Sequence, residues 1–279
     1  MSRPSPRELV VHSTLRLTAN MQRLILTGEA LADFPADSTS GYIKLMFATD
    51  GEPLTQATAV EGQRPLMRTY TVRAFDPEKR WLSVDFMLHN HGPQPAGPAA
   101  SWAERAQPGD RILVGGPGPT KFIYADADWY FLVGDMTALP AISCNLEQMP
   151  ADARGYAVIE IAGEDDRQTL VCPPGIEVIW VVDASPVPSL EQAAATAETS
   201  ALLQQVRASE WLHGDVAVWA ACEFHKMRAL RQYFRQEQNT GRKETYISSY
   251  WKLGRSEDEH KLDKRADQET IDQKAIDAP

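Results

Sequence analysis

The chain has 279 residues, of which 43% are hydrophobic and 24% charged, and such a chain forms one large or two ordinary globular domains. Its formal net charge of −10 argues against nucleic acid as a partner, because phosphate binding favours a basic surface. The sequence lacks both the roughly 20-residue apolar run of a membrane helix and, near its start, the apolar core of a signal peptide. We therefore expect a cytoplasmic protein that binds no membrane, with a monomer as the default.

The first ~125 residues predict an antiparallel β-barrel. Short runs rich in β-branched and aromatic residues are separated by Gly, Pro, Asp and Asn, which is typical of barrels. The expected strands are Leu9–Leu17, Arg23–Thr27, Tyr42–Ala48, Thr69–Ala74, Trp81–Leu88 and Arg111–Gly115. Gly97–Ala106 predicts a helix within this half. We assign residues 1–125 to this domain.

From residue 126 onward, apolar strands alternate with helical patterns, which predicts an α/β domain with a parallel five-stranded sheet. The expected strands are Trp129–Val133, Gly155–Ala162, Glu177–Val182, Val216–Ala221 and Glu244–Tyr250. The expected helices are Ala138–Met149, Leu190–Arg207 and Phe224–Gln236, with Thr137 as N-cap and Pro140 in the first turn of the first helix. We assign residues 126–255 to this domain and residues 256–279 to a charged helix or tail on the surface.

Three scattered cysteines, Cys144, Cys172 and Cys222, form no C-x-x-C pair. An odd and sparse count argues against a disulfide scaffold and against a zinc site. We expect small buried thiols and no bound metal ion.

The run Arg68-Thr69-Tyr70-Thr71-Val72-Arg73 carries the clearest functional signal. Because side chains alternate along a strand, Arg68 and Tyr70 share one face. The guanidinium could bind a pyrophosphate and the ring could stack on a flavin, while the Thr71 backbone amide contacts the flavin edge. On its own, the run fits an exposed basic strand with a half-buried tyrosine better than a flavin site.

A second ligand signal lies at Gly97, where a helix is expected to begin. Free backbone N–H groups at a helix N-terminus suit phosphate, and Ser101 could add a hydroxyl. The alternative is an ordinary capped helix. His89 ends the preceding strand, and we expect it to contact the ribityl chain or phosphate of a cofactor rather than to carry a proton. Gly115-Gly116-Pro117-Gly118-Pro119 is not a dinucleotide fingerprint, because no helix follows it, and we expect an interdomain turn.

The carboxyl ends of the parallel strands predict a nucleotide crevice, although no glycine triplet is present. Asp135, Thr137 and Ala138 follow the first strand, and Glu223 follows the fourth. For Glu223, the alternative is a helix N-terminal acid that the helix dipole favours. The run Gly163-Glu164-Asp165-Asp166-Arg167 follows the second strand and is mostly acidic, which suits a ribose hydroxyl better than a 2′-phosphate. We therefore expect NADH slightly more than NADPH, which Arg167 leaves open.

Taken together, these runs resemble the siderophore-interacting protein family, whose members are flavin-dependent ferric-siderophore reductases of the ferredoxin–NADP reductase-like superfamily. The matching pieces occur in family order and are Arg68–Arg73, Asp85–His89, Gly97–Trp102, Pro108–Asp110, Asp135–Ala141, Trp219–Glu223 and Tyr250–Gly254. The resemblance implies an N-terminal barrel with non-covalent FAD and a C-terminal domain for NADH or NADPH. It also implies reduction of chelated Fe(III) to Fe(II) in a basic pocket over the flavin edge. Since siderophores bind Fe(II) far more weakly, one electron frees the metal.

The resemblance assigns residues to three sites. The FAD site comprises Arg68, Tyr70, Thr71, Arg73, Asp85, His89, Gly97, Ala100, Ser101, Trp102 and Trp251. The nicotinamide site comprises Asp135, Thr137, Ala138 and Glu223. The ferric-siderophore site comprises Lys44, Lys121, Lys252 and Arg255, which resemble the family's basic triad. Such a cluster would attract an anionic ferric complex despite the acidic whole; exposed surface amines are the alternative.

Two departures from the family pattern stand out. Cys222 occupies a position where the family commonly has Gly, and the tail after Arg255 resembles that of some members only. The tail could lie across the nicotinamide crevice or help to take electrons from a ferredoxin. Two other functions stay open: a flavin or ferric reductase with a different acceptor, and a binding protein that sequesters siderophores without turnover.

Overall fold

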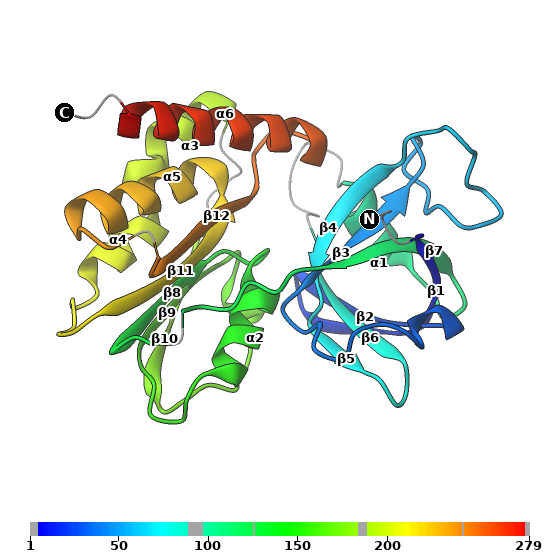
Figure 1. The fold of residues 1–279 in the computed structure, drawn as a ribbon, viewed down its shortest axis with the longest axis horizontal. Helices are drawn as coiled ribbons and strands as arrows, with labels where there is room; N and C mark the ends of the chain where they lie inside the picture. The colour runs from blue at the N-terminus through cyan, green and yellow to red at the C-terminus, as the bar shows by residue number, and fades with distance from the viewer. Residues whose placement is uncertain (1–4, 89–96, 125, 184–188, 242, 277–279) are drawn as a thin grey trace.

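The structure is a computed structural model that describes residues 5–88, 97–124, 126–183, 189–241 and 243–276. A seven-stranded sheet forms the N-terminal half and a five-stranded sheet the C-terminal half (Figure 1). All pairings in the first sheet are antiparallel, and all those in the second are parallel. The fold class predicted from the sequence is therefore confirmed.

The N-terminal sheet curls into a barrel-like shape with the strand order β4-β3-β7-β1-β2-β6-β5. Its strands are β1 (Arg7–Thr18), β2 (Met21–Thr27), β3 (Tyr42–Phe47), β4 (Leu66–Thr71), β5 (Ala74–Asp76), β6 (Trp81–Met87) and β7 (Arg111–Gly118). Alternate residues fill the interior, as Ile43, Leu45 and Phe47 of β3 illustrate with no exposed surface. Within the described residues, no hydrogen-bonded pair joins the edge strands β4 and β5, so the barrel is not closed.

Two local predictions in this half are wrong. The expected strand Thr69–Ala74 is divided, because β4 ends at Thr71 and β5 begins at Ala74. The glycine-proline run at Gly115–Pro119 is not an interdomain turn, because most of it belongs to β7, where Gly118 pairs with Tyr42. A Cβ atom on Gly118 would lie 2.1 Å from the Tyr42 ring, so the glycine allows the close strand approach.

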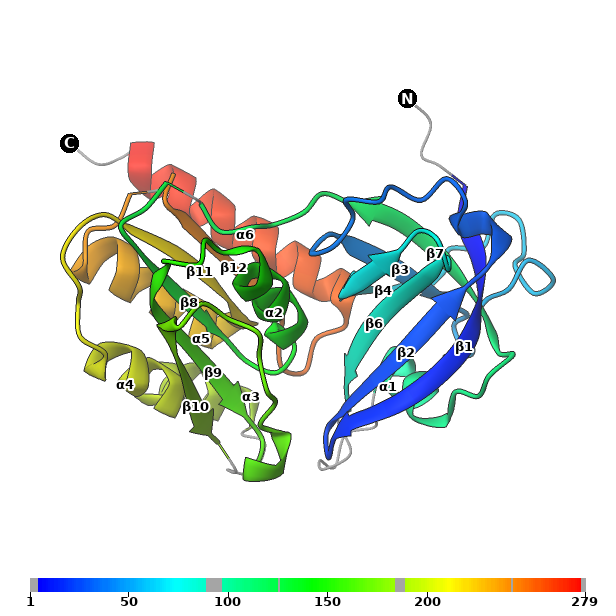
Figure 2. The ribbon, with the colours of Figure 1, turned by 90° about the horizontal axis from the view of Figure 1, so that it is seen from below.

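The C-terminal sheet has the order β10-β9-β8-β11-β12. Its strands are β8 (Trp129–Gly134), β9 (Arg154–Ile161), β10 (Gly175–Val182), β11 (Val216–Glu223) and β12 (Thr245–Trp251). Two of the three interior strands, β8 and β11, are buried along their whole length, as expected for a sheet covered on two faces. Helix α2 (Leu139–Gln148) covers the face toward the barrel, while α4 (Ala201–Ala208) and α5 (Phe224–Gln232) cover the other face (Figure 2).

Three helix predictions need correction. The expected helix Leu190–Arg207 is broken into α3 (Leu190–Thr196) and α4, because the hydroxyl of Ser200 caps α4 by accepting the Leu203 N–H. Helix α5 ends at Gln232 and continues as a π-helical turn, Tyr233–Glu237. Thr137 is not the N-cap of α2, since Ala138 holds that position and the Thr137 hydroxyl binds Asp135.

The charged C-terminal segment forms a helix, α6 (Glu257–Ile276), which bridges the two halves of the molecule. It begins beside β4 of the barrel and runs over the parallel sheet near β12 and α5 (Figure 1). No helix within the described residues is both long and apolar enough to cross a membrane.

Candidate functional site

Strand β4 presents the predicted flavin-binding residues at the open edge of the barrel. The Tyr70 ring packs on Phe86 with a centroid separation of 4.4 Å, so one of its faces belongs to the barrel core. Burial raises the pKa of the Tyr70 phenol, which therefore stays neutral at physiological pH. Thr71 ends the strand, partly exposed. A neutral aromatic ring held rigidly by its neighbours suits a planar cofactor ring.

Arg68 and the start of helix α1 (Pro98–Arg105) are the groups predicted to bind a diphosphate. The Arg68 guanidinium is half-buried and donates to the Met67 carbonyl oxygen at 2.8 Å, and it has no acidic partner among the described residues. Gly97 precedes α1 without a side-chain cap, and a Cβ atom there would meet nothing within 4 Å. Open backbone amides and an uncompensated cation are the groups that bind phosphate oxygens.

Four other residues predicted to bind FAD lie in the protein interior or in ion pairs. Ala100 and Trp102 are buried in the barrel core, at 4% and 2% exposure, while Ser101 is partly exposed. Asp85 accepts two hydrogen bonds from Arg23, at 2.6 and 2.8 Å. Arg73 binds Glu147 of α2 and so joins the barrel to the C-terminal half. His89 lies outside the described residues.

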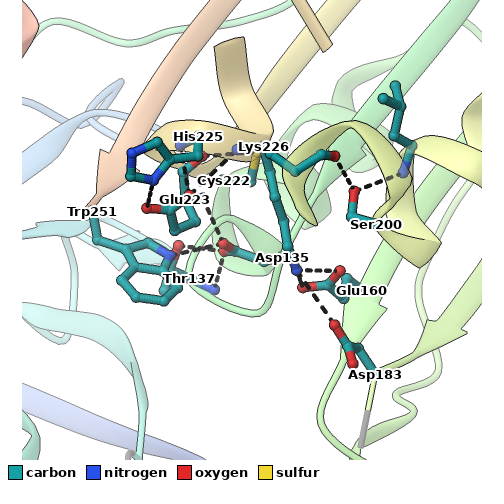
Figure 3. A network of polar contacts seen from close by, with 12 residues as sticks. Asp135, Thr137, Glu160, Asp183, Ser200, Cys222, Glu223, His225, Lys226 and Trp251 are labelled. Carbon is teal, nitrogen blue, oxygen red and sulfur yellow. Dashed lines mark hydrogen bonds and ion pairs between the residues drawn. The ribbon is translucent and has the colours of Figure 1, made fainter. Parts of the chain in front are cut away.

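Asp135 cross-links the carboxyl ends of three parallel strands (Figure 3). One carboxylate oxygen accepts the backbone N–H and hydroxyl of Thr137, at 2.9 and 2.5 Å. The other accepts the Glu223 N–H at 3.0 Å and the Trp251 indole N–H at 2.8 Å. The structure thus brings the predicted nicotinamide residues together, and it adds Trp251, which the sequence had suggested for FAD.

Glu223 caps helix α5, which is the alternative role that its sequence position allowed. Its carboxylate accepts the backbone N–H groups of His225 at 2.6 Å and Lys226 at 3.3 Å. A third hydrogen bond comes from the Leu253 N–H at 3.3 Å. The remaining nicotinamide candidate, Ala138, is fully buried beside β8. Asp135, Thr137, Glu223 and Trp251 are therefore held in place by hydrogen bonds to one another and to nearby backbone groups.

The sequence reasoning missed a charged group at the ends of β9 and β10. Lys226 binds both oxygens of Glu160, at 2.6 and 2.7 Å, and lies 3.5 Å from Asp183 (Figure 3). Burial raises the pKa of Glu160 although Lys226 opposes this effect. The sequence could have indicated this charged group, because Glu160 and Asp183 lie at the carboxyl ends of predicted strands, where ligand-binding side chains gather.

The acidic run after β9 has a different role from the expected one. Asp166 is fully buried and accepts hydrogen bonds from Thr18 and Asn20 in the turn that joins β1 to β2. Arg167 pairs with Glu164 on the surface. The carboxylate of Asp166 thus links the parallel sheet to the barrel.

Three of the four basic residues predicted to bind the ferric siderophore lie along the first two turns of α6. Lys44 of β3 is opposite Thr69 of β4, and its amine lies 3.2 Å from the Thr69 hydroxyl. Lys252 and Arg255 follow β12 and reach Asp263 of α6 at 3.0 and 3.3 Å. We call Lys44, Lys252 and Arg255 the basic cluster. Lys121 is exposed on the linker between the sheets, and its carbonyl oxygen accepts the Trp219 indole N–H at 2.8 Å.

An open antiparallel barrel followed by a parallel five-stranded sheet is the ferredoxin reductase-like architecture. The model of the siderophore-interacting FAD-binding domain matches residues 10–121, and that of the siderophore-interacting protein matches residues 127–254. The chain belongs to the siderophore-interacting protein family, as the sequence motifs predict.

Individual relatives extend over nearly the whole chain. The ferric vibriobactin reductase ViuB of Vibrio cholerae is 30% identical, covering 92% of this chain and 93% of the relative. An NADPH-dependent ferric-chelate reductase of Escherichia coli is 27% identical over 88% of this chain and 92% of its own length. The structure of the siderophore-interacting protein SipS from Aeromonas hydrophila superimposes with a TM-score of 0.77 at 32% identity, covering 96% of this chain and 98% of that chain.

Proposed function

We propose that the protein is an FAD-dependent reductase of ferric siderophores that releases iron as Fe(II) in the cytoplasm. The family, the match to an FAD-binding domain and the reductase names of two relatives support this proposal. The observation that carries it is the position of Lys44, which pairs in register with Thr69, one residue from Tyr70 on the flavin-type strand. Because side chains alternate along a strand, the Lys44 amine lies with Thr69 on the outward face, where it would attract an anionic chelate to the strand that carries Tyr70.

The chain's own residues would hold FAD at the barrel edge. We assign the diphosphate to Arg68 and the α1 amides that follow Gly97, and the isoalloxazine to Tyr70 and Thr71. When bound, FAD supplies the chemistry, accepting a hydride and releasing single electrons to the iron. The protein would supply orientation, because the contact with Phe86 fixes Tyr70 and would leave its other face for the flavin ring.

The basic cluster would bind the ferric chelate by charge rather than by a fitted cavity. Among its members, Lys44 is 29% and Lys252 18% exposed, so both amines are partly shielded from water and act more strongly than fully exposed ones. Their field opposes the net charge of the chain and would concentrate anions at this edge of the barrel. We add Lys121 as a peripheral member.

We propose a nicotinamide nucleotide as donor, bound where Asp135, Thr137 and Glu223 line the strand ends. The nearby carboxylates of Glu160 and Asp183 outnumber the Lys226 ammonium, so an additional 2′-phosphate would be repelled there. This favours NADH, whereas the relative from Escherichia coli is named for NADPH. A ferredoxin is the alternative donor.

The test is an absorption spectrum of the purified protein, followed by anaerobic turnover with an Fe(II)-trapping dye. We expect a yellow protein whose flavin bleaches with NADH and which produces Fe(II) from a ferric siderophore. A protein that is bleached only by a reduced ferredoxin would change the donor and leave the reductase intact. A colourless protein that FAD cannot reconstitute would refute the proposal and favour a siderophore-binding protein.

A further inference from the structure

The basic cluster already has an anionic occupant, the first two turns of α6. The segment Glu257–Asp263, which we call the acidic segment, contains four carboxylates and one lysine. Glu257 accepts the backbone N–H and the hydroxyl of Thr69, both at 2.7 Å, and lies 3.6 Å from the Lys44 amine. A residue 188 positions away in sequence therefore covers the strand that carries Tyr70.

The remaining cations of the cluster are covered in the same way. Asp263 lies 3.0 Å from Lys252 and 3.3 Å from Arg255, and Glu259 lies 3.5 Å from Arg255. The Lys252 amine also lies 4.5 Å from the centroid of the Phe224 ring, which fixes its position. Lys44, Lys252 and Arg255 thus each face a carboxylate of the same helix.

The acidic segment is attached by polar contacts rather than by an apolar face. Among residues 257–271, His260 is the one buried side chain, and its imidazole lies 2.8 Å from the Ser249 hydroxyl. The apolar Leu262 is 63% exposed. Partly exposed ion pairs contribute little net stability in water, whereas a buried apolar face would hold a helix firmly. The segment is therefore held by polar contacts, which a competing anion could replace.

The following part of the helix is anchored separately. Asp267 lies between Arg228 and Arg231 of α5, at 3.3 and 2.8 Å, and Lys264 donates to the Ser249 carbonyl oxygen at 3.0 Å. These contacts bind the helix to the parallel sheet without using the basic cluster. The first two turns could thus move while the rest of α6 stays attached.

We propose that the acidic segment of α6 is a displaceable internal competitor that occupies the ferric-chelate site until an anionic chelate takes its place. The inference rests on the proposed function, since it concerns the same cations. It predicts selection by charge, because a chelate has to outcompete four carboxylates. A strongly anionic chelate can do so, whereas a cationic one would be no better bound after the carboxylates are removed.

The test measures binding without turnover, using redox-inert gallium(III) complexes. The probes are gallium(III)–enterobactin, which is triply anionic, and gallium(III)–desferrioxamine B, which is cationic. In the variant Glu257→Gln with Asp263→Asn, the Kd of the anionic probe should fall about five- to tenfold, because two competing charges are lost. The Kd of the cationic probe should change less than about twofold. Glu269→Gln, which removes an exposed carboxylate elsewhere on α6, is the matched control and should change neither value.

Hydrogen exchange supplies a second readout on the unmodified protein. Binding of gallium(III)–enterobactin should accelerate amide exchange in residues 257–263 and leave the anchored residues near Asp267 unchanged. Unaltered or weaker binding in the double variant, or increased protection of residues 257–263 on binding, would overturn the inference. Tighter binding without Fe(II) production from any ferric chelate would instead contradict the proposed function and leave the inference standing.

Discussion

Asp166 provides a quantitative test of how the two halves of the molecule are held together. Its buried carboxylate accepts the Thr18 hydroxyl at 2.7 Å, the Asn20 backbone N–H at 2.9 Å and the Asn20 side-chain amide at 2.8 Å. A hydrogen bond to a charged group contributes roughly 1.5–3 kcal/mol, and water entering a vacated site recovers part of it. We therefore expect Asp166→Ala to lower the free energy of unfolding by about 3 kcal/mol.

The assay is urea unfolding of the FAD-saturated protein, followed by fluorescence, with the free energy extrapolated at a constant m-value. Asp165→Ala, which removes an exposed neighbouring carboxylate, is the control and should change stability by less than about 0.5 kcal/mol. The loss in free energy of unfolding for Asp166→Asn should lie between those of Asp166→Ala and Asp165→Ala, because an amide oxygen can keep the hydrogen bonds made by one carboxylate oxygen. A loss below about 1 kcal/mol for Asp166→Ala would show that the contact does not couple the barrel to the parallel sheet.

The other predictions concern the basic cluster, α6 and the donor. Lys44→Ala and Lys252→Ala should each raise the apparent KM for an anionic ferric siderophore about fivefold without loss of FAD, because one partly shielded charge contributes about 1 kcal/mol. The control is Lys79→Ala, since the Lys79 side chain is 59% exposed beside Trp81. A wild-type KM in both variants would place the pocket elsewhere. Burial lowers the pKa of His260 from 6.5 to about 4, with the charged neighbours Lys264, Asp263, Glu257 and Lys252 acting in both directions. In the released helix, His260 would bind a proton at a higher pH than in the attached helix. Attachment of the helix should therefore be full above about pH 6.5 and weaken as the pH falls toward 4. Amide exchange of residues 257–263, corrected for its intrinsic pH dependence, should reveal this weakening, and an equal response in His260→Gln would exclude the imidazole as its cause. Finally, kcat/KM should be higher for NADH than for NADPH, and a strong NADPH preference would disprove the electrostatic argument from Glu160 and Asp183.

The sequence predicted the features that depend on local pattern. The β-rich runs separated by Gly, Pro, Asp and Asn predicted the barrel, and the alternation of apolar strands with helical patterns from residue 126 predicted the parallel sheet. The first sheet ends with β7 at Gly118 and the second begins with β8 at Trp129. These features follow from nearest neighbours along the chain, so a single sequence contains them.

The partners of the acidic residues could not be predicted from the sequence, because they lie far away along the chain. Glu257 meets Thr69 across 188 residues, and Asp166 meets Asn20 across 146. Nothing in either local run distinguishes an acid that pairs with a distant strand from an acid that faces water. For the same reason, the acidic run after β9 suggested a ribose contact, whereas one of its carboxylates is buried against the barrel.

The most direct test of the proposed reductase is a single-turnover experiment on the FAD-loaded protein. The flavin is reduced anaerobically with a stoichiometric amount of NADH or dithionite and then mixed with an excess of an anionic ferric siderophore and an Fe(II)-trapping dye. We predict that the flavin absorbance returns while two Fe(II) form per flavin, since a two-electron carrier serves a one-electron acceptor. A flavin that stays reduced in the presence of bound chelate would contradict the account, because the site would then bind the complex without passing electrons to its iron.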